Sequence, residues 1–545
     1  MMTNREIAKY FDLLAKLMEL HKENPFKIRS YRNAYNTLRQ IGEPVVELNE
    51  NQLLEIPGIG KAIAKKIISL KEIGTFDALE KMLEKTPPGI LDLLKLKGLG
   101  PKKIRMIWKE LGVESLGELE YAIKENRLTL LKGFGEKTQN NILKQILFLE
   151  SVKGNYLFYK IIPIADDLIK ILTEKYPEES FSLTGNLRRY YPVVSSISIV
   201  SSIGIDIIKN DLEALLEFKE EEIFYKNIKI HFIKTISNSF GLDLFISTGP
   251  ELFVEKFKLT DSKDEKLIFE NNNIPFISPV FRDNVEIINN PEKFDESKYI
   301  HLADIKGIIH NHTVWSDGSD SVFDLANYCK EKGYSYLVVS DHSKSAFYAN
   351  GLKTDQIRYY LEDIAEANSK LEGFKIFSGI ESDILNDGSL DYDEEILSKF
   401  DVVIASIHSG LRMEKEKATK RILKSIENPF TRILGHISGR ILLAREGYPL
   451  DYDTIFQACV EHDVVIELNS NPHRLDIDWK LIYKAQDMGV KFSINPDAHA
   501  KQEVDYLKYG VLMAQKGGVL KENCLNIKNT EEFEDWVGEK QKKMF

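Results

Sequence analysis

The second half of the chain repeats one pattern, and this pattern limits the fold more than any other feature. Seven times, a short apolar run ends in a polar residue and is followed by a helical stretch; the runs are residues 308–312, 336–342, 375–381, 402–408, 432–436, 464–469 and 491–497. Apolar runs that alternate with helices indicate parallel strands, and closure into a barrel brings their C-terminal ends to one mouth. We therefore predict a seven-stranded α/β barrel within residues 300–545, with its functional site at that mouth.

Histidines and carboxylates gather at the ends of these runs. Seven of the eleven histidines lie there, and His310 and His312 stand two residues apart, so on a strand both side chains point the same way. Six of the histidines and three carboxylates make nine donors that converge at the predicted mouth: His310, His312, Asp317, His342, Glu381, His408, His436, Asp497 and His499. Because the set has nitrogen and oxygen donors but no cysteine, it suits manganese, zinc or iron, with magnesium as the alternative.

Short motifs within residues 300–500 resemble the polymerase-and-histidinol-phosphatase (PHP) domain. They are His-Asn-His at 310–312, Ser-Asp-His at 340–342, Gly-Ile-Glu at 379–381, Ser-Ile-His at 406–408 and Pro-Asp-Ala-His at 496–499. The resemblance implies a distorted (β/α)7 barrel and three divalent ions. It assigns His310, His312, Glu381 and Asp497 to the first ion, a bridging Glu381 with His408 and His436 to the second, and Asp317, His342 and His499 to the third.

Phosphoester hydrolysis is the chemistry expected of such a centre, because clustered cations activate a water and neutralise phosphate oxygens. We expect Asp317 and Glu381 to take part directly. Arg440 and Arg474 follow strand ends closely and could clamp substrate phosphates, although arginines in such loops are as often surface ion-pair partners. His473 and Asn469 are further candidates for the pocket lining.

The first 150 residues have helical periodicity and three Gly-x-Gly turns, at residues 56–61, 97–102 and 132–137. Each turn precedes a lysine-bearing helix whose free N–H groups suit a phosphate. The turns resemble helix-hairpin-helix elements, which bind the sugar-phosphate backbone of DNA without reading bases. The predicted DNA-binding residues are Gly58, Gly60, Lys61, Lys65, Lys66, Gly98, Gly100, Lys102, Gly133, Gly135 and Lys137. A purely structural helical domain is the alternative.

The balance of basic and acidic residues differs between residues 1–150 and the rest of the chain. Residues 1–150 carry 25 Lys and Arg against 20 Asp and Glu, whereas the remainder carries 48 against 64. Any polyanion binding is therefore expected to be local to the N-terminal part. Lys66 stands at a position similar to the lyase lysine of family-X DNA polymerases, but in a Lys-Lys pair on a helix a solvated role explains it equally well.

Residues 151–295 change to mixed strands and helices, and residues 183–200 resemble the α+β palm of a family-X DNA polymerase. Gly185, Arg188 and Arg189 match its Gly-Ser-x-Arg-Arg pattern, but Ser196 and Ser198 replace the two catalytic aspartates. Neutral serines are poor ligands for the hard cations of nucleotidyl transfer. Asp243 is a candidate for the third aspartate, and residues 274–282 resemble the end of the thumb. We predict a polymerase fold without polymerase activity.

The order of the three parts, 1–150, 151–295 and 300–545, resembles bacterial family-X DNA polymerases with a C-terminal PHP domain. We predict a DNA-repair enzyme, a metal-dependent 3′-5′ exonuclease or 3′-end processing nuclease, acting on primer-template, gapped or other 3′-ended DNA. The alternatives are an active polymerase with PHP proofreading, a small-molecule phosphatase of the histidinol-phosphate type, and a non-catalytic DNA-binding scaffold. The serines disfavour the first, the helix-hairpin-helix elements the second and the complete ligand set the third.

The remaining composition suggests an ordinary intracellular protein. Cys329, Cys459 and Cys524 are far apart and form no Cys-x-x-Cys pair, which fits a reducing compartment. The charged N-terminus does not resemble a signal peptide, and the uncharged run at residues 190–205 is too short to span a bilayer. We expect a cytoplasmic monomer that does not bind membranes.

Overall fold

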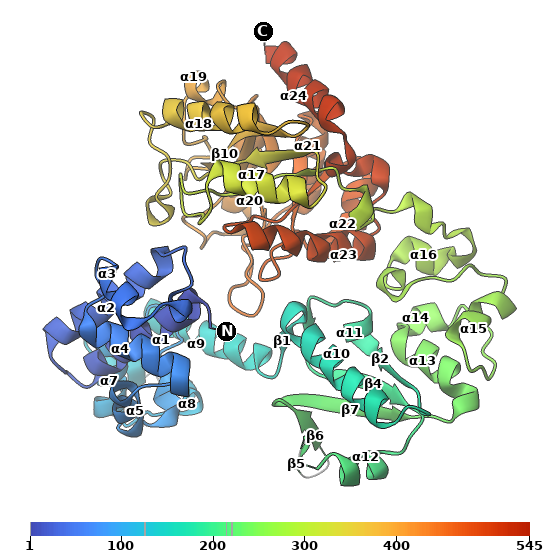
Figure 1. Cartoon of the computed structure of the whole chain (residues 1–545), viewed down its shortest axis with the longest axis horizontal. Coiled ribbons are helices and arrows are strands. Elements are labelled where there is room, and N and C mark those ends of the chain that lie inside the picture. The colour runs from blue at the N-terminus through green and yellow to red at the C-terminus, as the bar shows by residue number, and fades with distance from the viewer. Residues whose placement is uncertain (1, 125–126, 214, 220–221, 545) are drawn as a thin grey trace. The chain divides into compact units, whose positions relative to one another are not determined.

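The computed structural model describes residues 2–124, 127–213, 215–219 and 222–544. The chain divides into two compact units, Met1–Lys153 and Gly154–Phe545, coloured from blue to red in Figure 1. The predicted boundary near residue 300 lies inside the second unit and stays a prediction. Among the described residues, no helix combines the length and apolar character needed to cross a membrane.

The first unit is helical, as predicted. Its α-helices are α1 (Asn4–Leu20), α2 (Pro25–Gln40), α3 (Glu50–Glu55), α4 (Lys61–Ile73), α5 (Asp77–Glu84), α6 (Pro88–Leu93), α7 (Pro101–Leu111), α8 (Leu116–Lys124) and α9 (Glu136–Val152). Helix α1 starts with a capping box between Thr3 and Glu6 and buries Phe11 and Leu14 in the core. Exposed turns at Gly58, Gly98 and Gly133 separate helices of this unit.

The polymerase-like part (residues 151–295) opens the second unit. Its elements are β1 (Tyr156–Leu157), α10 (Phe158–Lys175), β2 (Phe181–Thr184), α11 (Gly185–Arg188), β3 (Val193–Val194), β4 (Ile197–Ser201), α12 (Ile205–Asp211), β5 (Glu217–Lys219), β6 (Glu222–Tyr225), β7 (Ile228–Lys234), α13 (Phe240–Thr248), α14 (Glu251–Val254), α15 (Glu265–Asn271) and α16 (Val285–Asn289). Five strands form a mixed sheet in the order β2-β4-β7-β6-β5. One face of this sheet buries Ile197, Ile199 and Ile230 in the core that includes α10 residues.

The barrel follows, and its strands confirm the seven predicted runs. Its elements are β8 (Gly307–Ile308), α17 (Val322–Glu331), β9 (Tyr336–Val339), α18 (Ile357–Lys370), β10 (Lys375–Asp383), α19 (Glu394–Leu397), β11 (Val402–Ser406), α20 (Lys415–Ile426), β12 (Thr431–Leu434), α21 (Tyr452–Glu461), β13 (Val465–Asn469), α22 (Trp479–Asp487), β14 (Phe492–Asn495), α23 (Leu507–Gly517) and α24 (Thr530–Met544). All neighbouring strands are parallel, in the order β14-β13-β12-β11-β10-β9-β8. A parallel bridge between Asn311 and Ala498 nearly closes the ring.

The barrel interior is apolar at one end and polar at the other. Ile309, Val338, Ile404 and other core residues are packed at the end covered by Phe533 and Trp536 of α24. The strands therefore carry their apolar residues into the core and end in side chains that face the opposite mouth. This arrangement places the predicted site on rigid strand ends.

Candidate metal centre

Glu381, on β10, lies at the middle of the predicted ligand set. One carboxylate oxygen, Oε1, is 3.2 Å from His310 Nε2, 3.2 Å from His408 Nε2 and 3.0 Å from His436 Nε2. The other, Oε2, is 2.8 Å from His342 Nδ1. Glu381 is fully buried. Several imidazoles around one carboxylate are consistent with the bridging role that the sequence resemblance implied.

The other two carboxylates complete the centre. Asp497 Oδ1 lies 3.1 Å from His312 Nε2, and Asp317 Oδ1 lies 3.3 Å from His499 Nε2. Asp317 is the most open of the donors, with 36% of its side chain exposed. The donor atoms fall into three groups, each compact enough to hold one ion: His312, Asp317, His342 and His499; His310, His312 and Asp497; His342, Glu381 and His408.

The structure thus brings all nine predicted donors together at one mouth of the barrel. The three groups differ from the predicted ligand sets. Glu381 is not grouped with His310 and Asp497, His342 joins Glu381 and His408 as well as Asp317 and His499, and His312 belongs to two groups. His436 contacts Glu381 but belongs to none of the three groups. The assignment of particular donors to particular ions stays a prediction.

The Nδ1 atoms of two histidines have carboxylate partners, and this arrangement fits a site for divalent cations. His310 Nδ1 is 2.5 Å from Glu467 Oε2, and His408 Nδ1 is 2.5 Å from Asp383 Oδ1. A carboxylate partner holds the proton on Nδ1 and leaves the Nε2 lone pair aimed at the centre, which is the usual arrangement of histidine metal ligands. The buried His310 Nε2 has no hydrogen bond of good geometry, so it is available as a ligand.

Three of the donors have a left-handed backbone. The φ angles are +65° at His310, +21° at His436 and +52° at Asp497. Residues other than glycine rarely adopt such angles, which cost of order 1–3 kcal/mol each and concentrate at functional sites. The angle at His310 also explains why β8 ends at Ile308 rather than continuing to His312 as the sequence suggested.

The cluster holds its carboxylates ionised. Burial alone raises the pKa of Glu381, but the charges of His408 and His310 outweigh burial and hold this pKa well below its usual range. Burial lowers the pKa of His408, whereas the charge of Glu381 and the hydrogen bond to Asp383 raise it to about 10. Burial and the neighbouring His499 lower the pKa of His312 to about 3. Ionised carboxylates are the form that binds cations, whereas His408 with this raised pKa must release its Nε2 proton when a cation binds.

The two predicted arginines have different surroundings. Arg474 Nε lies 3.6 Å from Asp497 Oδ2, so its guanidinium borders the cluster. Arg440 instead donates from Nε to the Arg474 carbonyl at 3.0 Å, from Nη1 to Asp478 at 2.5 Å, and from Nη2 to the Leu475 carbonyl. Arg440 therefore supports the loop that carries Arg474, and the phosphate clamp that we predicted for both arginines is compatible with Arg474 alone.

The two candidate pocket residues, Asn469 and His473, also differ in burial and in hydrogen-bond partners. Asn469 is buried and donates from Nδ2 to Asp497 Oδ2 at 3.1 Å and to Glu467 Oε1 at 2.9 Å, so it orients the ligands from behind. His473 is exposed, and its Nε2 shares a hydrogen bond of 2.9 Å with the hydroxyl of Tyr159. The hydrogen bond of His473 links the barrel mouth to helix α10.

Sequence reasoning missed the carboxylates that orient the ligands. Glu467 and Asp383 are buried, and each stands two residues from a residue already singled out, Asn469 on β13 and Glu381 on β10. Side chains two residues apart on a strand share a face. The spacings Glu381-x-Asp383 and Glu467-x-Asn469 could therefore have identified these two carboxylates from the sequence. Buried Asp341, which accepts hydrogen bonds from Thr313 and Ser316, had no such signal.

The predicted polymerase site has no comparable cluster among the described residues. Ser198 is on β4 and Ser196 precedes it, and the residue beside Ser198 on the neighbouring parallel strand β7 is His231. Asp243 lies on helix α13, so its assignment as the third aspartate does not fit the sheet. Within the part of the chain that the structure describes, all groups able to hold a metal ion lie in the barrel.

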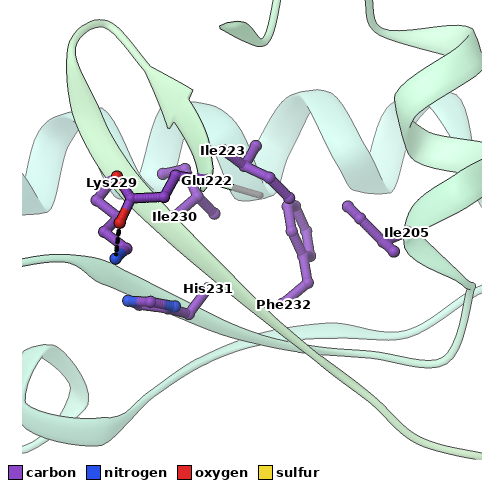
Figure 2. Close-up of a pocket in the computed structure, with 7 residues that line it drawn as sticks. All are labelled: Ile205, Glu222, Ile223, Lys229, Ile230, His231 and Phe232. Carbon is purple, nitrogen blue, oxygen red and sulfur yellow. Dashed lines mark hydrogen bonds and ion pairs between the residues drawn. The ribbon is translucent and has the colours of Figure 1, made fainter. Parts of the chain in front are cut away.

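A cavity with a volume of about 380 Å³ lies beside this sheet, and its lining residues are drawn in Figure 2. His231 and Lys229 lie on one side of β7, and Phe232 and Ile223 lie on the other. The carboxylate in the cavity lining, Glu222, forms an ion pair with Lys229. The lining therefore offers apolar surface and a neutralised acid rather than a set of cation ligands.

The two palm arginines are internal. Arg188 forms two hydrogen bonds with Glu265, at 2.9 and 2.8 Å, and Glu265 also binds the fully buried Arg282. Arg189 lies 3.4 Å from Asp283 and donates to Asn186 Oδ1 at 2.6 Å. Both guanidinium groups therefore stabilise the fold.

The three Gly-x-Gly turns of the helical unit share one geometry. The first glycine has φ of +92° at Gly58, +83° at Gly98 and +89° at Gly133, a conformation that favours glycine. The residue between the glycines is buried each time, whereas both glycines are exposed. The second glycines cap α4 and α7 and directly precede α9, with open space around Gly60, Gly100 and Gly135. A phosphate could approach each helix N-terminus closely.

The lysines at these turns are not equivalent. Lys61, Lys65, Lys102 and Lys137 are exposed, consistent with phosphate contacts. Lys66 donates to the Ala62 carbonyl and lies over the rings of Tyr31 and Phe76, at 5.6 and 5.9 Å. Packing along aromatic rings gives Lys66 a structural role that the other lysines lack.

Comparison with known families confirms the resemblances at the domain level. Residues 2–76 match the helix-hairpin-helix domain family, residues 90–146 the SAM-like helix-hairpin-helix tandem family, and residues 309–471 the PHP domain family. The chain is 30% identical to the DNA polymerase/3′-5′ exonuclease PolX of Bacillus subtilis (strain 168), over 98% of this chain and 99% of that protein.

Other relatives match less than half of the chain. A probable phosphatase of Thermoanaerobacter sp. (strain X514) is 28% identical over 43% of this chain and 95% of its own length. A probable phosphatase of Caldanaerobacter subterraneus subsp. tengcongensis is 26% identical over 43% of this chain and 92% of its own length.

Proposed function

The chain belongs to the bacterial family-X DNA polymerases that carry helix-hairpin-helix and PHP domains, and from this premise we propose that it is a metal-dependent 3′-5′ exonuclease or 3′-end processing nuclease. The observation that carries the proposal is the contrast within one chain. The barrel has nine converging donors with oriented imidazoles, whereas the palm presents Ser196, Ser198 and His231 where carboxylates would be needed. Hydrolysis is therefore assigned to the barrel.

The proposed division of labour follows from the residues at the mouth. Three bound divalent ions, manganese, zinc or iron, would supply an activated water and charge neutralisation at the phosphate. Glu381 bridges between ligand groups, Glu467 and Asp383 hold the histidine tautomers, and Asp317 faces the open side where substrate enters. Arg474 is placed to bind a phosphate oxygen next to Asp497.

The exposed glycine turns and lysines of the helical unit support a DNA substrate. They offer several phosphate contacts without base recognition, as a nuclease that acts on any 3′ end requires. A small-molecule phosphatase is the second candidate, because the relatives that match 43% of the chain are named probable phosphatases. Such an enzyme would have no use for the DNA-binding turns.

One experiment separates the candidates. The protein is incubated with a 5′-labelled primer-template, Mn²⁺ and the four nucleotides, and in parallel with histidinol phosphate. We expect the primer to shorten, and the variant His310→Ala/His312→Ala to lose this activity. Lengthening of the primer would instead support an active polymerase. Hydrolysis of histidinol phosphate without any change in the primer would support the small-molecule phosphatase.

A further inference from the structure

Several contacts join the polymerase-like part to the barrel, and two of them involve one loop and the residue that follows it. The loop, residues 470–478, connects β13 to α22 and carries Arg474. Near its start, His473 Nε2 shares a 2.9 Å hydrogen bond with the Tyr159 hydroxyl, and the two rings meet edge to face at 5.3 Å. Just after its end, Trp479 packs edge to face against Tyr191 at 5.8 Å.

The second contact is anchored by a buried charge. Lys516 on α23 is fully buried, forms an ion pair with Asp283, and donates to the Arg189 carbonyl at 3.1 Å. Its ammonium group lies 4.1 Å from the ring centre of Tyr191 and 4.5 Å from that of Trp479. Because a buried ammonium group must keep its partners, this contact fixes the polymerase-like part against α23 and the end of the loop.

The 470–478 loop connects these contacts to the metal centre. The His473 carbonyl accepts a 2.7 Å hydrogen bond from Leu442 N–H, and the Arg474 carbonyl accepts one of 3.0 Å from Arg440 Nε. The Arg474 side chain then reaches to within 3.6 Å of Asp497. A displacement of His473 would therefore move the residue next to it, which borders the ligands.

We propose that Tyr159 is a positioning residue for the barrel site: through His473 it holds the 470–478 loop so that Arg474 stays beside Asp497. This gives the polymerase-like part a role in hydrolysis that does not require nucleotide addition. The inference deepens the proposed function and rests on it only for the identity of the substrate. Tyr159 does not act on the reacting atoms itself.

The first test measures the loop directly, in the metal-free full-length protein. Hydrogen–deuterium exchange in peptides covering residues 470–478 is compared for the wild type, Tyr159→Phe and Tyr156→Phe. Tyr156 is the matched control, because its hydroxyl donates to the Asn227 carbonyl at 3.0 Å, within the polymerase-like part. We expect faster exchange in Tyr159→Phe alone. Unchanged exchange in Tyr159→Phe, or an equal increase in both variants, would overturn the proposal.

The second test is a double-mutant cycle with Arg474. We expect Tyr159→Phe to lower kcat by about 2- to 10-fold with KM nearly unchanged, the range for removal of one hydrogen bond, and to have no further effect in Arg474→Ala. His473→Ala should behave like Tyr159→Phe, whereas His473→Gln, which can still hydrogen-bond, should remain near the wild type. Equal reductions with and without Arg474 would show that Tyr159 does not act through Arg474 and would overturn the proposal.

The two tests distinguish failure of this inference from failure of the proposed function. The exchange measurement uses no substrate, and the cycle can be run on whichever phosphoester the wild type hydrolyses, DNA or histidinol phosphate. Hydrolysis of histidinol phosphate alone would refute the nuclease assignment and leave the role of Tyr159 to be decided by the cycle.

Discussion

The polymerase-like part and the barrel both place polar side chains on parallel strands. Among the residues that the structure describes, the groups that a metal centre needs surround these side chains in the barrel alone. In the palm, Ser198 and His231 lie side by side on β4 and β7 without a carboxylate. In the barrel, Glu381 is surrounded by imidazoles, and two of these are held by further buried carboxylates. In both parts the core residues and the polar residues of the candidate site are different, so a change at the site need not alter the fold.

The arginines show how the palm fold persists. Arg188 and Arg282 share the buried carboxylate of Glu265. Burial raises the pKa of Glu265, but the Arg188 hydrogen bonds and the Arg282 charge outweigh it and lower this pKa. Removing one partner would leave a buried charge unpaired, which is strongly destabilising. These residues remain constrained for structural reasons even if no nucleotide binds.

The largest effect on hydrolysis is expected when metal donors of the barrel are removed. Glu381→Gln, or His310→Ala/His312→Ala, removes donors from the centre and should lower phosphoester hydrolysis by about 1000-fold. Hydrolysis is measured on 5′-labelled single-stranded DNA with Mn²⁺. The control is His462→Ala, an exposed histidine that follows α21. Full activity in the donor variants would move the chemistry away from the barrel.

The orienting carboxylates should have a smaller effect on the same centre. Glu467→Gln and Asp383→Asn weaken the hold on Nδ1 of His310 and His408, and should lower metal affinity by about 10- to 100-fold. Isothermal titration with Mn²⁺ or Zn²⁺ measures the change. Asp387→Asn, at an exposed acid in the loop after β10, should leave affinity unaltered. If all three variants bind alike, these carboxylates do not tune the ligands.

The helical unit should affect DNA affinity without changing the chemistry. The triple variant Lys61→Ala/Lys102→Ala/Lys137→Ala removes one exposed lysine from each turn. The slope of log K against log salt for duplex DNA should fall by about 0.9 for each phosphate that the variant no longer binds. Fluorescence anisotropy across a salt series measures it. A triple variant at Lys9, Lys71 and Lys81, exposed lysines outside the turns, should keep the wild-type slope.

The smallest effect is expected in the palm. Ser196→Ala/Ser198→Ala should change DNA hydrolysis by less than about two-fold, because neutral serines contribute little to cation binding. Neither the wild type nor this variant should lengthen a primer. Primer extension by the wild type that disappears in the serine variant would break the comparison, since it would show that the palm still has catalytic function.

The amino-acid sequence determined the fold class and most of the ligand set. Apolar runs alternating with helices specify parallel strands, and strand ends must meet at one mouth, so the nine donors could be identified before any coordinates. The repeated Gly-x-Gly turns were equally clear, because positive φ angles at Gly58, Gly98 and Gly133 require a residue type that the sequence shows directly.

Only the tertiary structure decided which side chains contact one another. It showed that Arg440 supports a loop while Arg474 reaches Asp497, that Glu467 orients His310, and that Tyr159 contacts His473 across 314 positions of sequence. It also showed the left-handed backbone at His310. Local sequence encodes periodicity and turn preference, whereas these contacts depend on packing between distant segments. The two-residue spacing could place Glu467 on the same strand face as Asn469, but it could not predict which distant side chain each residue contacts.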